Sequence, residues 1–530
     1  MKLILRQIAL PPDAPQSYAV DQAYKKLKSA GISAKNGEIS RISVDSRKKS
    51  DIKLVYSVIA ECGGASEKSL AKCGAEVYRE EKLEIKYGKE KRNGKIAVIG
   101  FGPAGMFSSL MLAENGYKTV VFERGGEVNE RAADVERFLK SGALDTESNV
   151  QFGAGGAGTF SDGKLITRIN DPACGYVLKR LVGFGAPSDI LTSSRPHIGT
   201  DVLRGMIANI TEKLLSYGAD IRFRTAVTDV KQSGDGVTLK TPDGEEYFDA
   251  AILATGHSAR DTYKMLYDNG VIMEKKPFSV GCRIEHLQED IDFSMYGEAY
   301  EKYAGYLPHA EYNLSYRTVH NGFERGVYSF CMCPGGKVIC AATEKDGIVT
   351  NGMSYHGRDG KNANSALAVS VLPSDLPDDL LSGIDFQRGI ERAAYGVSGG
   401  FYAPCQTVGS FLNGDKNVLA DIVPTYEPGT VMHDISAVLP GFISDMLKTG
   451  LYEFDKKIKG FKNPSAVLTA PETRTSAPLR ILRNAERYSD SIPSLYPCGE
   501  GAGYAGGITS AAADGINTAV KIMSRFSPDK

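Results

Sequence analysis

The chain has 530 residues, with 63 Lys and Arg against 64 Asp and Glu, so its formal net charge is −1. This length exceeds what one hydrophobic core usually serves and indicates two or three domains. The balanced charge excludes a general attraction to nucleic acid or anionic membranes, and no apolar run is long enough to span a bilayer.

Targeting signals and cysteines indicate the compartment. Charged residues interrupt the N-terminal run too early for a signal peptide. The nine cysteines are scattered and form no CxxC motif, which is typical of free thiols in a reducing environment. We therefore expect a cytoplasmic protein with no membrane contact.

Residues 1–92 predict a small α+β module. Apolar runs predict strands and helical patterns predict helices in the order strand, helix, two strands, helix, strand, with the clearest segments at 3–10, 18–30, 39–44, 52–60 and 66–73. This order is typical of a ferredoxin-like unit. The charged segment 87–94 is expected to link the module to the rest of the chain.

The predicted module is rich in positive charge. Lys and Arg outnumber Asp and Glu in residues 1–92, and the reverse holds for the remainder. A solvated surface explains this most simply. The alternatives are contact with RNA, or docking to an acidic protein or to the acidic remainder of the chain.

Residues 95–123 carry a strand-turn-helix-strand pattern that predicts a dinucleotide site. The apolar run 96–99 ends in Gly100-x-Gly102-x-x-Gly105, a helical segment follows, and the second apolar run ends at Glu123. Gly100 permits the tight turn, Gly102 lets the backbone approach a pyrophosphate, and Gly105 lets helix and strand pack closely. The helix N-terminus favours phosphate, and Glu123 can accept hydrogen bonds from ribose hydroxyls.

Two further GxGxxG matches lack this context. The segment 153–158 follows no strand, and 501–506 precedes a helix but no second strand. After Glu123 the sequence predicts helices and short strands, and this part ends with the strand 250–256; the clearest segments are 128–141, 201–217, 220–223, 227–231 and 236–241.

Residues 278–465 differ in character and predict an inserted, β-rich α+β domain. Short β-type runs occur at 278–284, 326–333 and 337–343. The tail from 466 is expected to return to the first fold with a short strand, a glycine-rich turn and the helix 508–526. The predicted architecture is therefore α/β: a Rossmann-like domain (93–277 and 466–530), the inserted substrate domain (278–465) and the N-terminal module (1–92).

Three separated segments together resemble the glutathione-reductase-type FAD-binding fold: the Gly100–Glu123 unit, the strand end Ala254-Thr255-Gly256, and Gly499-Glu500 with Gly507-Ile508. The resemblance implies that Glu500 contacts the ribityl or pyrophosphate region. It also implies that the helix opening at Gly507 points N–H groups at the flavin, where they would stabilise the reduced form. The usual acid is Asp, so Glu500 departs from the pattern. No second complete dinucleotide unit is present.

Over nearly its whole length the chain resembles a bacterial family of FAD-dependent dehydrogenases, described broadly as NAD(FAD)-utilising dehydrogenases. The motifs that carry the resemblance are the segments 152–164, 279–286, 327–336, 351–358 and 471–478. The family implies an FAD enzyme and no particular substrate.

These arguments predict a set of FAD contacts. Only glycine lets a backbone pass close to a cofactor in the loop 153–158; a mobile loop is the alternative. The predicted contacts are Gly100, Gly102, Pro103, Ala104, Gly105, Glu123, Arg124, Gly155, Gly156, Gly158, Thr159, Val227, Ala254, Thr255, Gly256, Gly499, Glu500, Gly507 and Ile508.

Candidates for chemistry are fewer. His286 could donate a proton near the flavin, or be a hydrogen-bonded structural histidine. Arg474 could hold an anionic substrate or balance charge on reduced flavin, or pair with Glu472. Cys331 and Cys333 lie two residues apart on a predicted strand, where a disulfide between them would be strained, and structural thiols are favoured. No His, Cys, Asp and Glu group has metal-ligand spacing.

The sequence therefore predicts an FAD-dependent oxidoreductase that moves hydride or electrons to or from an unknown small organic substrate. NADH, NADPH or a redox partner protein could serve as the electron donor. The alternative is an FAD-containing RNA-binding or regulatory protein that uses the basic module, although no RNA-contact motif is evident.

Overall fold

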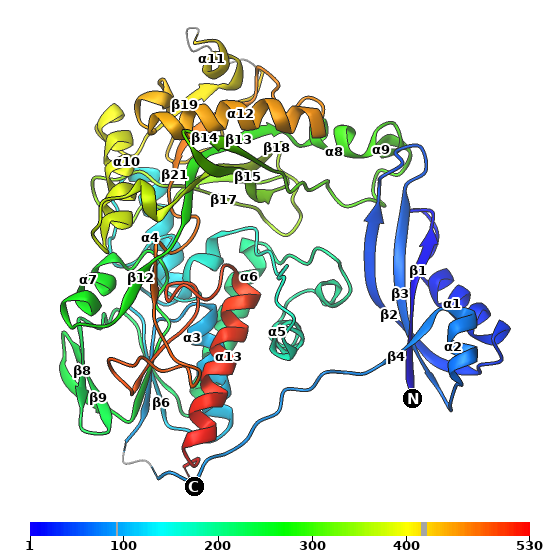
Figure 1. The fold of residues 1–530 in the computed structure, drawn as a ribbon, viewed down its shortest axis with the longest axis horizontal. Coiled ribbons are helices and arrows are strands. Elements are labelled where there is room, and N and C mark those ends of the chain that lie inside the picture. The colour runs from blue at the N-terminus through cyan, green and yellow to red at the C-terminus, as the bar shows by residue number, and fades with distance from the viewer. Residues whose placement is uncertain (92–93, 415–420, 530) are drawn as a thin grey trace.

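The computed structural model describes residues 1–91, 94–414 and 421–529. Its three largest sheets hold four, five and seven strands (Figure 1). Together they give the α/β architecture that the sequence predicts.

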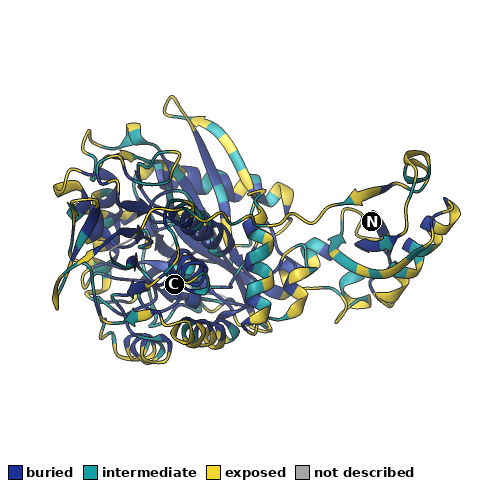
Figure 2. Cartoon of the chain, turned by 90° about the horizontal axis from the view of Figure 1, so that it is seen from below, coloured by how far each residue is buried: buried dark blue, intermediate teal, exposed yellow. Residues whose placement is uncertain are grey.

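The N-terminal module is a four-stranded antiparallel sheet with two helices. Its strand order is β2-β3-β1-β4, as in ferredoxin-like folds, and the module stands out from the rest of the chain (Figures 1 and 2). Its core is made by apolar side chains of the strands and of α1. The elements are β1 (Lys2–Leu10), α1 (Ser17–Ser29), β2 (Ala34–Asp45), β3 (Lys53–Cys62), α2 (Glu67–Cys73) and β4 (Ala75–Tyr78).

The module is attached to the rest of the chain through β2 and the turn that follows it. The Ile42 N–H donates to the Thr192 carbonyl at 2.7 Å, and the Ser194 N–H donates to the Ile42 carbonyl at 2.8 Å. Ile52, 1% exposed, packs into the core of the seven-stranded sheet. The module is therefore fixed beside residues 192–194.

A five-stranded parallel sheet forms the second unit, in the order β23-β11-β5-β6-β7. Its central strands are short apolar runs buried on both faces, as is usual for parallel sheets. The strands are β5 (Ile96–Ile99), β6 (Thr119–Phe122), β7 (Asp220–Arg222), β11 (Ala250–Leu253) and β23 (Leu495–Pro497).

Helices cover one face of this sheet, and a small antiparallel sheet with one helix covers the other. Successive residues of β5 point to opposite faces, so that Val98 packs with the helical layer and Ile99 with the other. The first layer holds α3 (Pro103–Glu114), α5 (Pro172–Gly183), α6 (Thr200–Ser216) and α13 (Ile508–Arg525), with α4 (Val128–Ser141) beside it; the second holds β8 (Asp229–Ser233), β9 (Gly236–Thr241), β10 (Gly244–Phe248) and α7 (Arg260–Asp268).

The seven-stranded sheet runs in the order β14-β15-β18-β13-β21-β19-β20, and α12 packs against it (Figure 1). Its strands are β13 (Phe278–Leu287), β14 (Ser315–His320), β15 (Phe323–Cys333), β18 (Asn362–Val371), β19 (Ala403–Thr407), β20 (Thr430–Met432) and β21 (Val467–Glu472). The other elements of this region are α8 (Gln288–Tyr296), α9 (Ala299–Lys302), β16 (Lys337–Cys340), β17 (Thr350–Met353), α10 (Ser382–Ser398), α11 (Val408–Asn413) and α12 (Gly441–Lys457).

The return to the parallel sheet comes later than residue 466. The strand β21 pairs with β13 and β19, so it belongs to the seven-stranded sheet rather than to the tail of the first fold. The chain comes back through β22 (Leu479–Ile481), which pairs with β12 (Met273–Lys275), and then through β23. A strand buried on both faces has the same apolar sequence pattern in either sheet. The sequence therefore could not show that β21 belongs to the seven-stranded sheet.

Candidate active site

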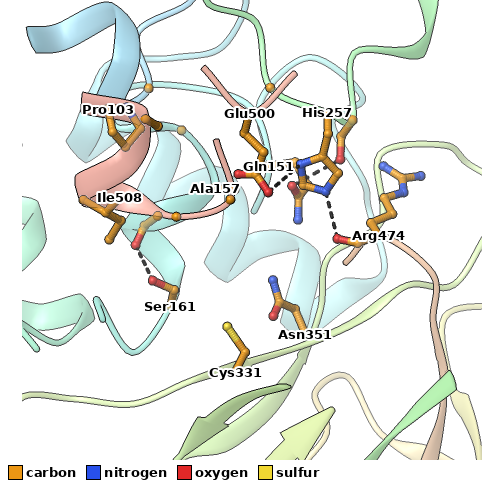
Figure 3. Close-up of a pocket in the computed structure, with 18 of the residues that line it drawn as sticks. Pro103, Gln151, Ala157, Ser161, His257, Cys331, Asn351, Arg474, Glu500 and Ile508 are labelled. Atoms are coloured by element: carbon orange, nitrogen blue, oxygen red, sulfur yellow. Dashed lines mark hydrogen bonds and ion pairs between the residues drawn. The ribbon is translucent and has the colours of Figure 1, made fainter. Parts of the chain in front are cut away.

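A cavity of about 880 Å³ lies where the parallel sheet meets the seven-stranded sheet. Its walls include the carboxyl ends of β5, β6 and β11 on one side and residues of β15 and β21 on the other. Ligands of open parallel sheets bind at this edge. Pro103 and Ile508 lie on one side of the cavity, and Cys331 and Asn351 face them across it (Figure 3).

The first glycine motif forms part of the cavity wall. Gly100 has a φ of +101°, and Gly102 is the N-cap of α3, with no side chain to cover the first N–H groups. A Cβ on Gly105 would lie 1.9 Å from the Gly100 carbonyl oxygen, so helix and strand touch here. Gly100, Gly102, Pro103 and Ala104 line the cavity, whereas Gly105 lies behind them.

Glu123 ends β6 and lines the cavity while almost buried, at 5% exposure. Its carboxylate accepts backbone N–H groups of Phe101 at 2.8 Å and of Gly125 and Gly153 at 2.9 Å. A carboxylate offers about four acceptor positions, so capacity remains for a ligand hydroxyl. Glu123 therefore joins the first glycine turn to the second glycine loop.

The loop 153–158 reaches the cavity only in part. Gly156 and Gly158 line it, and a Cβ on Gly156 would lie 2.9 Å from the Gly102 Cα. Gly155 and Thr159 face away from it, which corrects their predicted role as contacts. A Cβ on Gly155 would meet Ile207 at 2.2 Å.

Arg131, buried within α4, holds this loop in place. Its guanidinium donates to the Thr159 hydroxyl at 3.0 Å and to the carbonyls of Asn149, Val150 and Ala154. Thr159 is therefore part of the support behind the glycine wall. Sequence reasoning missed Arg131, because a lone Arg in an amphipathic helix usually marks its exposed face.

The strand end Ala254-Thr255-Gly256 lines the cavity and leads directly into His257. The His257 Nε2–H donates to the Arg474 carbonyl at 2.8 Å, and its Nδ1 lies 3.8 Å from the Glu500 carboxylate (Figure 3). Glu500 is in the wall. Gly499 is not, because its N–H donates to Asp514 at 2.8 Å and it packs against Ala104.

The helix α13 points its N-terminus into the cavity. Gly507 is its N-cap and has no side chain to satisfy the first N–H groups. Gly507 and Ile508 both line the cavity, so this positive helix end and that of α3 open on the same space. Glycine walls, two helix N-termini and an acceptor at Glu123 fit the pyrophosphate, ribose and ring of FAD.

The remaining predicted contacts, Arg124 and Val227, also line the cavity. Arg124 pairs with Glu147 at 2.9 Å and with Asp261 at 2.5 Å. Val227 comes from the segment just before β8.

His286 lies outside the cavity, which corrects its predicted catalytic role. It is 2% exposed and packs against Phe461, whose carbonyl accepts the Nε2–H at 2.7 Å. Burial lowers its pKa, so the ring is neutral. The sequence could not show which face of β13 is turned toward the site.

Arg474 lines the cavity with most of its side chain buried. It pairs with Glu391 at 3.1 Å, not with Glu472, whose partner is Arg283 at 3.2 Å. Arg260 holds the other side of Glu391 at 2.7 Å. Burial opposes ionisation of Glu391, but Arg474 and Arg260 outweigh it and lower the pKa of that carboxyl well below its usual range.

A second charged group, which sequence reasoning largely missed, lines the opposite part of the cavity. The Lys164 ammonium lies 3.1 Å from Asp162 and 3.2 Å from Glu311, and Arg358 bridges the same two carboxylates at 2.5 Å each. Burial would raise the Asp162 pKa, but Lys164 and Arg358 together lower it. The proximity of Glu311 and Arg358 to the glycine loop had no signal in the sequence.

Cys331 and Cys333 line the cavity but remain thiols. Cys331 is exposed to the cavity, but desolvation by the surrounding wall raises the pKa of its thiol to about 11; burial raises the pKa of Cys333 to about 12. The strand is irregular here, since Cys331 has a φ of +45° and the pairing of β15 with β18 shifts between Phe330 and Cys333. This irregularity breaks the simple alternation that the sequence predicts. All nine cysteines are free.

Within the described ranges, no helix has the length and apolar character to cross a membrane. No cluster of His, Cys, Asp and Glu among the same residues has the arrangement of a metal site.

Comparison with known proteins agrees with this geometry. Two family models match: "FAD-dependent protein, C-terminal domain-like" over residues 277–475 and "Flavin containing amine oxidoreductase" over residues 130–274. An uncharacterized protein of Clostridium beijerinckii is 43% identical over 535 residues, covering 99% of both chains. The class of protein is thus an FAD-dependent oxidoreductase. The chain belongs to the same family as the Clostridium protein, a family of FAD-dependent proteins.

Solved structures resemble the chain only distantly. Glycine oxidase from Bacillus cereus ATCC 14579 has a TM-score of 0.35 at 11% identity, covering 81% of this chain and 95% of its own. CtdE in complex with FAD has a TM-score of 0.32 at 12% identity, with 81% and 84% covered. These likenesses are too distant to carry an argument about this chain.

Proposed function

We propose that the chain holds FAD noncovalently in the described cavity and exchanges hydride or electrons with a small organic substrate bound against β15. The observation that carries the proposal is that α3 and α13 open their uncapped N-termini on one glycine-walled space. That combination suits a ligand with a pyrophosphate at one end and an electron-accepting ring at the other.

Different residues of the cavity would contact different parts of the cofactor, as in glutathione-reductase-type folds. Gly102 and Gly156 would flank the pyrophosphate, and Glu123 would accept from a ribose hydroxyl. Glu500 would face the ribityl chain, and the first N–H groups of α13 would face the pyrimidine edge. When bound, the flavin supplies the redox chemistry; the protein supplies positioning and charge.

The substrate would enter opposite these walls. β15 and β17 provide Phe330, Cys331 and Asn351 there, and the loop after the glycine segment provides Asp162 and Lys164. We assign residues 278–465 with β21 to the part that covers the flavin and sets specificity. Arg474 would act through charge at this wall, with Glu391 fixing its position.

The electron donor would be NADH or NADPH bound at the open face of the flavin, or a redox partner protein. The described chain has one complete strand-GxGxxG-helix-strand unit, since the run from β23 to α13 has no strand after it; a nicotinamide would therefore dock without a dedicated domain. The nine free thiols suit a cytoplasmic protein.

The test is the identity of the released cofactor. Protein purified with its yellow chromophore is denatured, and the supernatant is analysed by chromatography. We expect FAD, released completely. FMN, or colour that stays with the precipitated protein, would contradict the proposal.

A further inference from the structure

One part of the cavity lies beyond the walls assigned to FAD. We call it the outer chamber and define it by cavity-lining residues from four separate segments of the sequence: Lys164, Ile166, Arg168, Arg195, Glu311 and Phe330. Nothing in the family descriptions assigns it a ligand.

The ionic groups of the outer chamber leave an excess of positive charge. Asp162 and Glu311 are its two carboxylates, and both are held by Lys164 and Arg358. Arg195 adds a third cation: its Nη1 donates to the Glu311 carbonyl at 2.8 Å and lies 3.9 Å from the Glu311 carboxylate. The two carboxylates are therefore paired with three cationic side chains, Lys164, Arg195 and Arg358.

Arg168 adds a further cation without an acidic partner. The residue lines the cavity and is exposed, and no carboxylate of the described residues lies within 4.0 Å of its guanidinium. A guanidinium presents a planar fork of donors that matches carboxylate or phosphate oxygens. Unlike Arg124, Arg474 and Arg358, it is free to receive such a group.

Apolar side chains stand exposed in the same chamber. Ile166 is 49% exposed and Phe330 41%. Apolar surface that borders a cavity favours an apolar ligand body, because burying it releases water.

We propose that the outer chamber binds an organic acid, with its carboxylate or phosphate on Arg168 and its apolar body against Ile166 and Phe330. The proposal rests on the proposed function, because it names the substrate class of the same site. A cationic amine is the opposite choice: it would meet an excess of cations and find both carboxylates occupied.

Four probes with one aromatic body separate the possibilities: benzoate, phenyl phosphate, benzamide and benzylamine. Each is titrated into the FAD-loaded protein, and binding is followed both by the flavin difference spectrum and by calorimetry. We expect benzoate or phenyl phosphate to bind, with benzamide and benzylamine at least about tenfold weaker, the loss expected for a hydrogen bond to a charged group. The ranking of the two anions tells carboxylate from phosphate.

Variants locate the site. Arg168→Gln should weaken binding of the anionic probe about tenfold or more, and Arg168→Lys should weaken it less. Arg168→Glu should bind benzylamine more tightly than the anions. Arg317→Gln, on the exposed hairpin strand β14 with a side chain 69% exposed, is the matched control and should bind like the wild type.

Benzylamine binding more tightly than both anions would overturn the proposal, and so would Arg168→Gln binding the anions as the wild type does. Protein that carries no flavin but still binds benzoate by calorimetry would count against the proposed function alone. A flavin-loaded protein that binds no anion would count against the outer chamber alone.

Discussion

Gly102 and Gly156 lie against each other in the wall of the cavity. A methyl group built on Gly156 would lie 2.9 Å from the Gly102 Cα, while one built on Gly102 would lie 3.7 Å from the Gly156 Cα. Two loops that are distant in the sequence thus meet backbone to backbone, and glycine at both positions lets them form one wall that a pyrophosphate could approach closely.

Substitutions at Gly102 and Gly105 should separate cofactor binding from folding. Gly102→Val would put a side chain where the pyrophosphate is proposed to bind and should weaken FAD binding by about 10-fold to 100-fold, or about 1.4–2.8 kcal/mol. It should cost little stability, because a Cβ on Gly102 meets only the Gly156 Cα, at 3.7 Å. Gly105→Ala would place its Cβ 1.9 Å from the Gly100 carbonyl oxygen and should destabilise the fold itself. Flavin titration and thermal unfolding give the two readouts.

The control for this pair is Gly183→Ala, because a Cβ on this α5 residue meets nothing within 4 Å. It should change neither quantity. Full FAD retention by Gly102→Val would place the pyrophosphate elsewhere.

Through Glu391, the folding stability of the protein should depend on pH. Its pKa in the folded chain lies below the unfolded value of about 4.3, because Arg474 and Arg260 favour the carboxylate although burial opposes it. The stability it contributes is thus complete above about pH 4.3 and is lost as the pH falls toward the folded pKa.

Glu391→Gln removes the counter-charge that Arg260 and Arg474 share and leaves only Glu344, 3.3 Å from Arg260; it should cost about 3–5 kcal/mol at neutral pH. The difference from the wild type should shrink below about pH 4. Urea unfolding across pH measures it. Glu486→Gln, which breaks an exposed pair with Lys521, should cost at most about 1 kcal/mol; equal costs for the two variants would refute the argument.

Cys331 should react slowly with alkylating agents. Although the residue is exposed to the cavity, the surrounding wall desolvates its thiol and raises its pKa to about 11, so little thiolate exists at neutral pH. Mass spectrometry should show the rate of carbamidomethylation at this residue still rising between about pH 8 and pH 10, where an ordinary thiol with a pKa of about 8.5 levels off. A rate already maximal at pH 8 would identify a reactive thiolate instead.

The N-terminal module should influence the outer chamber and not the cofactor. Among the described residues, none from 1 to 91 lines the cavity, but Ile42 pairs with the backbone of residues 192–194 next to Arg195. Ile42→Pro removes one donor of that pairing and should weaken the anionic probe about fivefold, the effect of a hydrogen bond worth about 1 kcal/mol. FAD content should stay unchanged, and Arg41→Ala is the control.

Loss of flavin in Ile42→Pro would tie the module to the cofactor. Salt-sensitive binding of RNA by the wild type would instead favour the alternative role for its basic surface.

Local patterns predicted much of the fold. The helix 128–141 has the predicted bounds, and the unit β5-α3-β6 follows from two apolar runs and three glycines. These features depend on residues that are close in the sequence, and the periodicity of apolar residues predicts such local structure directly.

Features that depend on contacts between distant parts of the chain could not be predicted from local sequence patterns. The partner of Arg474 is Glu391, on a different element, rather than the nearby Glu472. His286 sits on the correct strand but on the face away from the cavity. The chamber around Arg168 and Arg195 exists only because separate loops meet there.

The anaerobic visible spectrum of the purified protein tests the central claim most directly. The account predicts flavin bands that bleach when NADH, NADPH or another reductant is added and that return with an electron acceptor. Protein that shows no flavin bands, even after incubation with FAD, would contradict it.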